Sequence, residues 1–577
     1  MSSYLDLLEE IFNKDANRVA IKAYGKSITY GQLDEESNKL ITLFNSVTQK
    51  NIRRVAIYGE GSVEHFATML FCIKMNITFI NVDVSWPKEY IAKICADLKI
   101  DYCFYKKQYQ KIALNQCDGI CIDDIDAKPT KSFDLKQARL SYIVTTSGTT
   151  GTAKYVLKKE EALIRSYKQM LSDVQIMSGG IAQQYSSLSF AYGLDQSLIM
   201  LISRKTICIG SRDTLTNLDT VYKNIAQNKA DTAFFPASII KLLSKNHLLF
   251  ENIPTCLKAI VGGGEPLVVS ADFIFEMRNH DIVLYNNYGS TETGTIFFSK
   301  YQPSILDIEE YNKVPVGARP LNGFQVKIIN DQNGNEMSIL CENFYNEYIE
   351  TEKEQHNFIF SRDGSALVEY RTGDIADFND SNYYIIGRGD NVVNIRGYRV
   401  SIEYIESVIM QILKGEECCV VPIHNPFLET RLVCFYSADK FNAQFVKEKS
   451  IEMLPKYMVP IVFQKVDKIE HSKNGKIDRK KMASTYNLLE PTYSFNNAVL
   501  VGRIQDIFHR VSHIDINDKQ IDLSFERLGL DSIDIASAIC LVEDEEKTSI
   551  PMSLIADKKI MSIRTLCEYI EKKKREN

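Results

Sequence analysis

The sequence predicts an α/β protein of several domains that ends in a small bundle of helices. Three observations lead to this prediction. The chain has 577 residues, whereas a single compact core rarely grows past about 250–300 residues. Over residues 1 to about 250, short β-rich runs alternate with amphipathic stretches, which is typical of a parallel sheet covered by helices. The residues after about 495 instead have only helical periodicity.

The elements follow from the spacing of apolar residues. Val55-Ala-Ile-Tyr58 predicts a strand, the stretch from Val63 to Ile73 predicts a helix, and Ile77-Thr-Phe-Ile-Asn81 predicts the next strand. A similar unit recurs at Thr232-Ala-Phe-Phe235, with a helix after it. From about residue 311 to 385 the runs alternate between apolar and polar residues and are separated by turns, so we expect a β-rich section.

Changes in composition predict the domain boundaries. Gly387-Arg-Gly-Asp390 is a plausible hinge, and the largely polar segment around Pro491 is typical of a linker. Helices are expected over Leu500 to Ser512, Ser532 to Glu546 and about Ser562 to Lys573. We therefore expect a large α/β unit over residues 1–389, a small α+β unit over 390–486, a linker over 487–497 and a helical bundle over 498–577.

The composition argues against two classes of partner. The chain has 68 Lys and Arg against 74 Asp and Glu, a net charge of −6, so it lacks the basic excess of a nucleic-acid binder. No apolar run approaches the ~20 residues that cross a bilayer. The 13 cysteines have no zinc-ribbon spacing, and an odd number without a framework is typical of reduced thiols. We expect a cytoplasmic protein that binds neither nucleic acid nor membrane.

One loop has the residues of a phosphate cradle. Thr145-Thr-Ser-Gly-Thr-Thr-Gly-Thr-Ala-Lys154 follows an apolar run. Its glycines let the backbone bend sharply, hydroxyl and N–H groups can surround an anion, and a lysine closes the loop. The lysine does not directly follow the second glycine, so this is not a Walker A loop.

Further motifs follow in a fixed order. They are Gly262-Gly-Gly-Glu-Pro266, Asn287-Tyr-Gly-Ser-Thr-Glu292, Tyr370-Arg-Thr-Gly-Asp374, Gly387-Arg-Gly-Asp390 with Ile395-Arg-Gly-Tyr-Arg399, Leu454-Pro-Lys-Tyr-Met-Val-Pro460 and Asn474-Gly-Lys-Ile-Asp478. In this order the set resembles the adenylate-forming enzymes, specifically the adenylation domains of nonribosomal peptide synthetases, from about residue 30 to 480. The resemblance implies a large core, a mobile small subdomain that pivots near Asp390, and activation of a carboxylic acid as acyl-AMP with ATP and Mg²⁺.

The same resemblance assigns roles to individual residues. Thr291 would contact the α-phosphate, Glu292 would help hold Mg²⁺, and Lys476 would bridge the substrate carboxylate and the ATP oxygens. The positive charges of Mg²⁺ and Lys476 suit this chemistry. The substrate carboxylate and ATP are both anions, and attack of one anion on another requires charge neutralisation. The implied nucleotide-binding residues are Thr146, Ser147, Gly148, Thr149, Thr150, Gly151 and Lys154 around the phosphates, Gly263, Gly264, Glu265, Asn287, Tyr288 and Gly289 around the adenine, and Asp374 with Arg388 at the ribose.

A second motif lies in the helical bundle. Phe525-Glu-Arg-Leu-Gly-Leu-Asp-Ser532-Ile-Asp resembles the phosphopantetheine attachment motif of acyl and peptidyl carrier proteins. Ser532 lies at the expected start of a helix, where free N–H groups favour a phosphodiester. The resemblance implies a covalent 4'-phosphopantetheine on Ser532, loading of the acyl group there as a thioester, a phosphopantetheinyl transferase as partner, and a downstream biosynthetic enzyme that accepts the acyl group in secondary metabolism.

The segment Ser189-Phe-Ala-Tyr-Gly-Leu-Asp-Gln-Ser197 departs from amino-acid-activating domains. These usually place an aspartate directly after the phenylalanine, where Ala191 stands here, and a buried ammonium without a counter-charge is costly. The segment also resembles aryl-acid ligases, which favours an acid without an α-amino group. An amino acid whose ammonium pairs with Asp195 is the alternative. The expected pocket residues are Ala191, Tyr192, Asp195, Phe234, Val261, Gly263, Asn287, Thr295 and Ile296.

Two further departures keep other functions open. Ala153 and Tyr155 replace a common proline and glycine near Lys154, and residues 336–350 match the family's glycine-rich strand pair poorly. An acyl-CoA ligase is a second hypothesis, against which the appended carrier motif argues. A decayed adenylation domain that serves as a scaffold for the carrier is a third.

Overall fold

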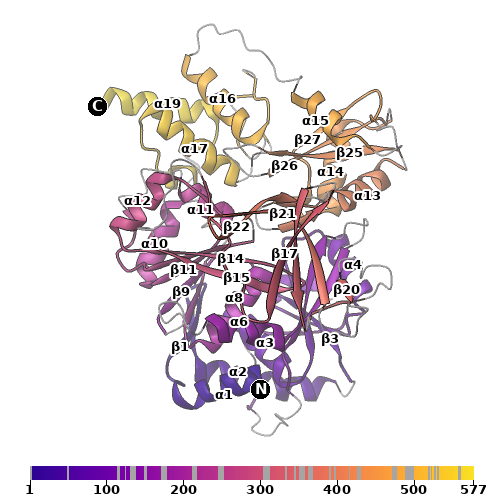
Figure 1. Ribbon diagram of the computed structural model, residues 1–577, viewed down its shortest axis with the longest axis vertical. Coiled ribbons are helices and arrows are strands. Elements are labelled where there is room, and N and C mark those ends of the chain that lie inside the picture. The colour runs from indigo at the N-terminus through magenta and orange to yellow at the C-terminus, as the bar shows by residue number, and fades with distance from the viewer. Residues whose placement is uncertain are drawn as a thin grey trace.

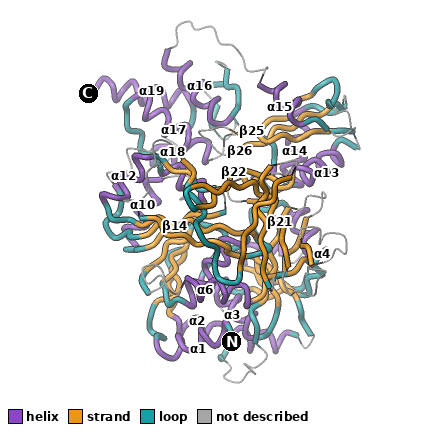
Figure 2. The backbone as a smooth tube through the Cα atoms, in the orientation of Figure 1, coloured by secondary structure: helices purple, strands orange, loops and turns teal. Residues whose placement is uncertain are grey.

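The computed structural model describes residues 3–48, 51–113, 117–123, 125, 127–129, 138–147, 153–170, 179–210, 218–244, 252–264, 266–302, 312–331, 334–342, 346–349, 358–360, 368–388, 392–395, 398–414, 416–424, 430–438, 440–470, 477–487, 499–517, 520, 521, 523–525, 528, 530, 532–556 and 560–576. Figure 1 shows a large body, with a small subdomain and a helical bundle side by side above it. Figure 2 shows strands running through the body, with helices both between them and around them.

The first sheet is mainly parallel, as the alternation of strands and helices predicts. From β14 to β1 neighbouring strands run parallel, whereas β15 and β2 pair antiparallel at the edges. The interior strand β12 is buried at every position, because helices cover both faces of the sheet. The strand order is β15 (Gly294–Tyr301), β14 (Val283–Ser290), β12 (Ala259–Gly263), β11 (Thr232–Pro236), β9 (Ile181–Gln184), β10 (Thr206–Ile209), β1 (Val19–Ala23) and β2 (Lys26–Thr29).

The second sheet lies beside the first, and helices separate the two. The helix predicted from Val63 is α3 (Val63–Lys74), which connects β3 to β4 and contacts strands of both sheets. Helix α8 (Ala191–Ile202) belongs to the same hydrophobic cluster as α3. The strand order is β19 (Glu347–Ile349), β8 (Ala153–Lys159), β7 (Ser141–Ser147), β4 (Thr78–Val82), β3 (Arg54–Tyr58), β5 (Tyr102–Tyr105) and β6 (Gly119–Cys121).

Other helices complete the layers of the large body. The outer face of the first sheet packs on α10 (Leu218–Asn228), α11 (Ala237–Leu243) and α12 (Ala271–Asn279), and that of the second on α4 (Lys88–Asp97). In the part of the chain that the structure describes, no helix combines the length and apolarity needed to cross a membrane. The remaining elements of the body are α1 (Tyr4–Lys14), α2 (Tyr30–Val47), α5 (Gln110–Ala113), α6 (Glu160–Met170), β13 (Val268–Val269) and β16 (Asn312–Lys313).

The β-rich section expected near residues 311–385 forms a third, antiparallel sheet. Strand β18 pairs with both β17 and β21, and β21 also pairs with β20 and β22. This sheet packs on β15 of the first sheet through a small apolar cluster that contains Ile296 and Phe297. Its strands are β17 (Phe324–Asp331), β18 (Gly334–Cys341), β20 (Phe358–Phe360), β21 (Val368–Asn379) and β22 (Asn382–Arg388).

The small subdomain contains a hairpin and a sheet with two different faces. The hairpin is β23 (Val392–Ile395) with β24 (Tyr398–Ser401). Cys418 and Val420 point from the sheet into the cluster shared with α4 of the large body, whereas Cys419 and Val421 point into a separate cluster with Ile477. The other elements are α13 (Ile402–Ile412), β25 (Cys418–His424), β26 (Thr430–Tyr436), α14 (Ala443–Met453), β27 (Val462–Lys465) and α15 (Arg479–Asn487).

The C-terminal bundle is formed by α16 (Val499–Ser512), α17 (Ser532–Glu546), α18 (Ser553–Ala556) and α19 (Ile563–Glu576). The predicted apolar stripe of α17, which includes Ala538, Ile539 and Val542, is buried in its core. Helix α17 also faces the rest of the protein, because Asp534 forms a buried ion pair with Arg431 of β26. Residue 389 and residues 488–497 lie outside the described residues, so the domain boundaries stay predictions.

Candidate active site

A cavity of about 140 Å³ lies where the two parallel sheets and the small subdomain meet. It opens at the carboxyl ends of β12 and β14, the edge at which open α/β sheets usually bind ligands. The residues that line it are Tyr90, Val144, Thr145, Phe190, Ala191, Tyr192, Asp195, Gln196, Gly264, Pro266, Asn286, Asn287, Tyr288, Gly289, Ser290, Thr291, Gly294, Thr295, Val316, Asp374, Ile385, Asn394, Tyr398, Tyr457 and Met458.

Gly263 ends β12 beside the cavity and requires the absence of a side chain. It pairs with Asn287 of β14 in the parallel register. A Cβ atom on Gly263 would lie 2.6 Å from the ring of Tyr192 and 2.8 Å from the carbonyl oxygen of Asn287. Only glycine therefore lets Tyr192 pack against the strand end, with its hydroxyl donating to the Val261 carbonyl at 3.2 Å.

The expected adenine and ribose residues are adjacent. Tyr288 and Asp374 both line the cavity, and the Tyr288 hydroxyl donates to the Asp374 carboxylate at 2.6 Å. The Asp374 amide donates to the buried Thr372 hydroxyl at 3.0 Å, which fixes the backbone at this point of β21. Arg388 pairs with Asp374 across the β21 and β22 ladder, and its side chain lies outside the described part.

Thr291 and Glu292 lie in the turn between β14 and β15. Ser290 and Thr293 hold this turn, because each backbone amide donates to the other hydroxyl, at 3.1 and 3.2 Å. Thr291 lines the cavity, and Glu292 is buried with its carboxylate accepting from the Tyr348 hydroxyl at 2.7 Å. A buried carboxylate oxygen beside the cavity is a hard ligand of the kind that Mg²⁺ prefers, so this turn fits the expected metal.

Lys154 reaches the same region from the second sheet. It lies on β8, and its ammonium nitrogen is 5.6 Å from the centre of the Tyr348 ring. Several other expected residues cannot be placed, because Gly148, Thr149, Thr150, Gly151, Glu265, Asp390 and Lys476, together with the side chains of Thr146, Ser147 and Ser532, lie outside the described part of the structure.

The cavity lining includes some of the residues expected in the acid pocket and not others. Ala191, Tyr192, Asp195, Asn287 and Thr295 line the cavity, and Gly263 is adjacent to it. Phe234 and Val261 instead belong to the hydrophobic core between the sheets. Ile296 packs into the cluster of the third sheet. None of these three side chains is part of the described lining. Ile296 points to the face opposite Thr295, because strand residues alternate between faces. Phe234 and Val261 share the strand face of Gly263 but belong to the core cluster against which Ala191 packs.

Asp195 already has strong partners. Its carboxylate accepts from the Lys158 ammonium at 2.5 Å and from the Tyr142 hydroxyl at 2.6 Å. Lys158 is 2% exposed, so the two opposite charges are buried together. Burial and the nearby Asp195 raise the pKa of the Tyr142 hydroxyl, which stays a donor. Sequence analysis did not single out Lys158, because no motif contains it.

The small subdomain closes the cavity with aromatic rings. The centre of the Tyr398 ring lies 3.9 Å from that of Phe190 and 4.0 Å from that of Tyr457, and all three residues line the cavity. Ile477, which directly follows Lys476, packs in the cluster on the other face of the subdomain sheet. In this arrangement the β23 and β24 hairpin faces the cavity, and the residue next to Lys476 faces away from it.

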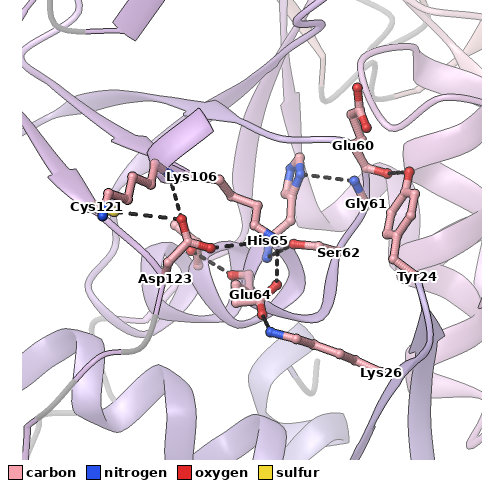
Figure 3. Close-up of polar contacts among 12 residues, drawn as sticks. Tyr24, Lys26, Glu60, Gly61, Ser62, Glu64, His65, Lys106, Cys121 and Asp123 are labelled. Carbon is pink, nitrogen blue, oxygen red and sulfur yellow. Dashed lines mark hydrogen bonds and ion pairs between the residues drawn. The ribbon is translucent and has the colours of Figure 1, made fainter. Parts of the chain in front are cut away.

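A buried histidine supports the wall of the cavity. Figure 3 shows His65 beneath the loop after β3, where its Nδ1 accepts from the Gly61 amide at 3.3 Å. Nε2 lies 2.8 Å from the Asn81 side-chain oxygen, and the Asn81 amide group donates to the Leu188 carbonyl at 3.0 Å. This chain of bonds requires neutral His65 with its proton on Nε2. It holds the loop that leads into Phe190 and Ala191.

His65 should make the stability of the large body depend on pH. Burial lowers its pKa from 6.5 to about 4. Between these values the unfolded chain binds more protons than the folded one, so the free energy of unfolding falls as the pH is lowered. Relative to pH 7, we expect His65 to cost about 2 kcal/mol of stability at pH 5. Urea unfolding followed by the fluorescence of Trp86, the one tryptophan of the chain, measures this.

The contribution of His65 is isolated by comparing variants. His65→Gln should reduce the loss of stability between pH 7 and pH 5 by about 2 kcal/mol, because glutamine does not titrate. His280→Gln, at the C-terminal end of α12, serves as the control and should leave the loss as it is in the wild-type protein. An equal pH dependence in His65→Gln and in the wild-type protein would contradict the assignment.

Comparison with known proteins identifies the chain. Residues 8–340 match the family described as AMP-binding enzyme. The chain belongs to this family. Residues 502–570 match the phosphopantetheine attachment site. Together the two matches confirm the predicted combination of an AMP-binding enzyme with a phosphopantetheine carrier domain.

Curated relatives of this AMP-binding enzyme include parts of much longer proteins. Gramicidin S synthase 2 of Brevibacillus brevis is 25% identical over 590 residues, which cover 99% of this chain but 13% of that protein. D-alanine--D-alanyl carrier protein ligase of Staphylococcus epidermidis is 26% identical over 500 residues, which cover 84% of this chain and 100% of the relative. The first match therefore extends over only a small part of the synthase.

Solved structures share the fold and confirm the predicted fold class. Holo-PA1221, a nonribosomal peptide synthetase protein with adenylation and carrier domains bound to a vinylsulfonamide inhibitor, has a TM-score of 0.77 at 18% identity, covering 99% of this chain and 97% of that one. The fused adenylation and carrier didomain NpsA-ThdA from Klebsiella oxytoca has a TM-score of 0.67 at 21% identity, covering 85% of this chain and 97% of that one.

Proposed function

We propose that this enzyme activates a carboxylic acid without an α-ammonium group, of the aryl-acid class, and loads it on its own carrier domain. The observation that carries the substrate class is the buried ion pair between Asp195 and Lys158. Asp195 was the candidate partner for an amino-acid ammonium, and Lys158 already balances its charge. Ala191, which opens α8 at the cavity, carries no charge at all.

The rest of the lining supports the same class. Among the described lining residues the carboxylates are Asp195 and Asp374, and Asp374 accepts from Tyr288 at the expected ribose position. An ammonium taken out of water without a counter-charge costs several kcal/mol, so this lining disfavours an amino acid. The rings of Phe190 and Tyr192 instead offer the apolar contact that an aromatic acid needs.

In the first half-reaction, which forms acyl-AMP, the residues of the cavity would position two anions, the carboxylic acid and ATP. Thr291 would donate to the α-phosphate, while Glu292 would hold the magnesium ion, which supplies positive charge where negative charge develops. Lys154 and Lys476 would add two further cations, and Asp374 would accept from the ribose hydroxyls. Two contacts of the described residues support this division: Tyr348 lies against both Glu292 and Lys154, and Tyr288 donates to Asp374. The small subdomain would bring in Lys476.

In the second half-reaction, which transfers the acyl group to the carrier domain, the small subdomain would turn the β23 and β24 hairpin toward the cavity. A phosphopantetheine arm on Ser532 would supply the thiol that takes the acyl group from acyl-AMP and releases AMP. Ser532 fits attachment of this arm because it opens the 15-residue helix α17. The ion pair between Arg431 and Asp534 joins this helix to the small subdomain two residues beyond Ser532. The arrangement with Ile477 turned away from the cavity supports a loading state, and a pivot near Asp390 would restore the adenylating one.

An amino-acid substrate is the second candidate, and the relatives favour it. One of them is named for D-alanine, and a Vibrio cholerae adenylation domain of the same fold was solved with glycyl-adenosine-5'-phosphate, with a TM-score of 0.69 at 17% identity and covering 83% of this chain and 98% of that one. Such a substrate would have to displace Lys158 from Asp195. A phosphopantetheinyl transferase and a downstream enzyme that accepts the loaded acyl group are the expected partners in either case.

A substrate screen separates the two candidates. We expect acid-dependent ATP–pyrophosphate exchange to be fastest with an aryl or other acid that lacks an α-amino group. In the double variant Lys158→Met with Asp195→Asn, which removes both charges and keeps the volume, exchange with that acid should stay within about tenfold of the wild-type rate. The second candidate would be established instead if the wild-type protein exchanges fastest with an amino acid and the double variant loses that exchange by more than about a hundredfold.

A further inference from the structure

A segment that matches the family pattern poorly contacts the turn that contains Thr291 and Glu292. Residues 346–349 belong to the stretch that matches the family poorly, and three of them form β19. This strand pairs antiparallel with β8, and Tyr348 lies opposite Val156. Lys154 is two residues from Val156 on the same face of β8, within diagonal reach of a tyrosine ring. The register therefore places Tyr348 beside the lysine that closes the phosphate loop.

Two side chains of this segment also hold Glu292. The Tyr348 hydroxyl donates to the Glu292 carboxylate at 2.7 Å. The side-chain amide of Asn346 donates to the Glu292 carbonyl oxygen at 2.9 Å, and its own oxygen accepts from the Lys159 amide at 3.3 Å. Glu292 is 4% exposed, so these bonds are shielded from water. The turn of the expected magnesium ligand is thereby tied to the strand of the phosphate lysine.

We propose that Tyr348 is a positioning residue that orients Glu292 toward magnesium and holds Lys154 toward the phosphates of ATP. Its hydroxyl bond fixes the orientation of the Glu292 carboxylate. Groups that orient a metal ligand in this way commonly change metal affinity 10- to 100-fold, roughly, when they are removed. Its ring face attracts the Lys154 ammonium. This inference rests on the proposed use of Glu292 and Lys154 and adds a residue that neither motif contains.

The two contacts of Tyr348 can be removed separately. Tyr348→Phe keeps the ring beside Lys154 and loses the bond to Glu292, whereas Tyr348→Leu loses both. Tyr167→Phe is the matched control, because the Tyr167 hydroxyl donates to the Ile202 carbonyl at 3.1 Å inside the same body, away from the cavity. Circular dichroism melting curves of the three variants establish that each one folds before binding is compared.

Calorimetric titration with a non-hydrolysable ATP analogue, with and without Mg²⁺, measures both contacts without turnover. For Tyr348→Phe we expect affinity for the magnesium complex about tenfold weaker, and unchanged affinity for the analogue in EDTA. The Mg²⁺ concentration for half-maximal pyrophosphate exchange should rise by a similar factor, with little change in kcat at saturating Mg²⁺. Tyr348→Leu should also bind the metal-free analogue more weakly, because Lys154 loses its ring contact.

The outcomes distinguish this inference from the proposed function. Equal magnesium dependence in Tyr348→Phe and Tyr167→Phe, in both titration and exchange, would overturn the role of Tyr348. Absence of exchange by the wild-type protein with every acid would overturn the proposed substrate class. The calorimetric comparison would still decide the inference in that case, because it needs only the nucleotide and the metal.

Discussion

Replacing Lys476 with alanine should abolish acid-dependent ATP–pyrophosphate exchange, with a loss of at least about a hundredfold. The reason is that this cation would neutralise the two anions that must meet in the adenylation step. Lys468→Ala is the matched control in the same subdomain, because the Lys468 side chain is 75% exposed and pairs with Glu470. Exchange at the wild-type rate in Lys476→Ala would contradict the role.

The same variant also tests the orientation of the small subdomain. Ile477 packs on the face of the subdomain sheet that points away from the cavity, in the arrangement that brings Tyr398 against Phe190. If this arrangement is the loading state, Lys476 takes no part in it. Lys476→Ala supplied with synthetic acyl-AMP should therefore load its carrier at close to the wild-type rate, measured by intact-protein mass spectrometry. Equal loss of both half-reactions would show that the lysine serves each of them.

Replacing Ser532 with alanine should prevent attachment of the phosphopantetheine arm and therefore all loading, while pyrophosphate exchange stays at the wild-type level. Treatment with a phosphopantetheinyl transferase and coenzyme A, followed by mass spectrometry, gives the result directly. Ser549→Ala changes another serine of the same bundle, an exposed one, and should still be modified. Attachment to Ser532→Ala at another residue would overturn the assignment of Ser532.

Much of the fold and of the nucleotide site follows from local sequence. Short apolar runs that alternate with amphipathic stretches predict the parallel sheets, because a strand that helices cover on both faces consists mainly of apolar residues. The motif at Gly263 can be recognised because a strand end that packs directly on a ring tolerates only glycine. Tyr288 and Asp374 were both predicted from their motifs, but the hydrogen bond between them was not. They are 86 residues apart in the chain, so only the packing of the third sheet against β14 brings them together.

The acid pocket shows where local reasoning fails. Phe234, Val261 and Ile296 match pocket positions by order along the chain, yet they pack in the cores. Phe234 and Val261 share the face of Gly263 yet lie in the core, because distant segments decide which part of a strand face is covered. Lys158 was missed for the same reason, because its partner Asp195 lies on α8. Asn346 and Tyr348 likewise carry no local signal, since both contact Glu292, which is more than 50 residues away in sequence.

The sequence by itself therefore determined the family, the order of the domains and the types of residue available for the chemistry, because motifs of short range fix backbone bends and charges. The tertiary structure decided which of those residues contact one another. It paired Asp195 with Lys158. It joined Glu292 and Lys154 through Tyr348, and it turned the β23 and β24 hairpin toward the cavity. Pairs between buried side chains form only when the layers of the fold pack together, since folding brings charges that are distant in sequence within reach of one another.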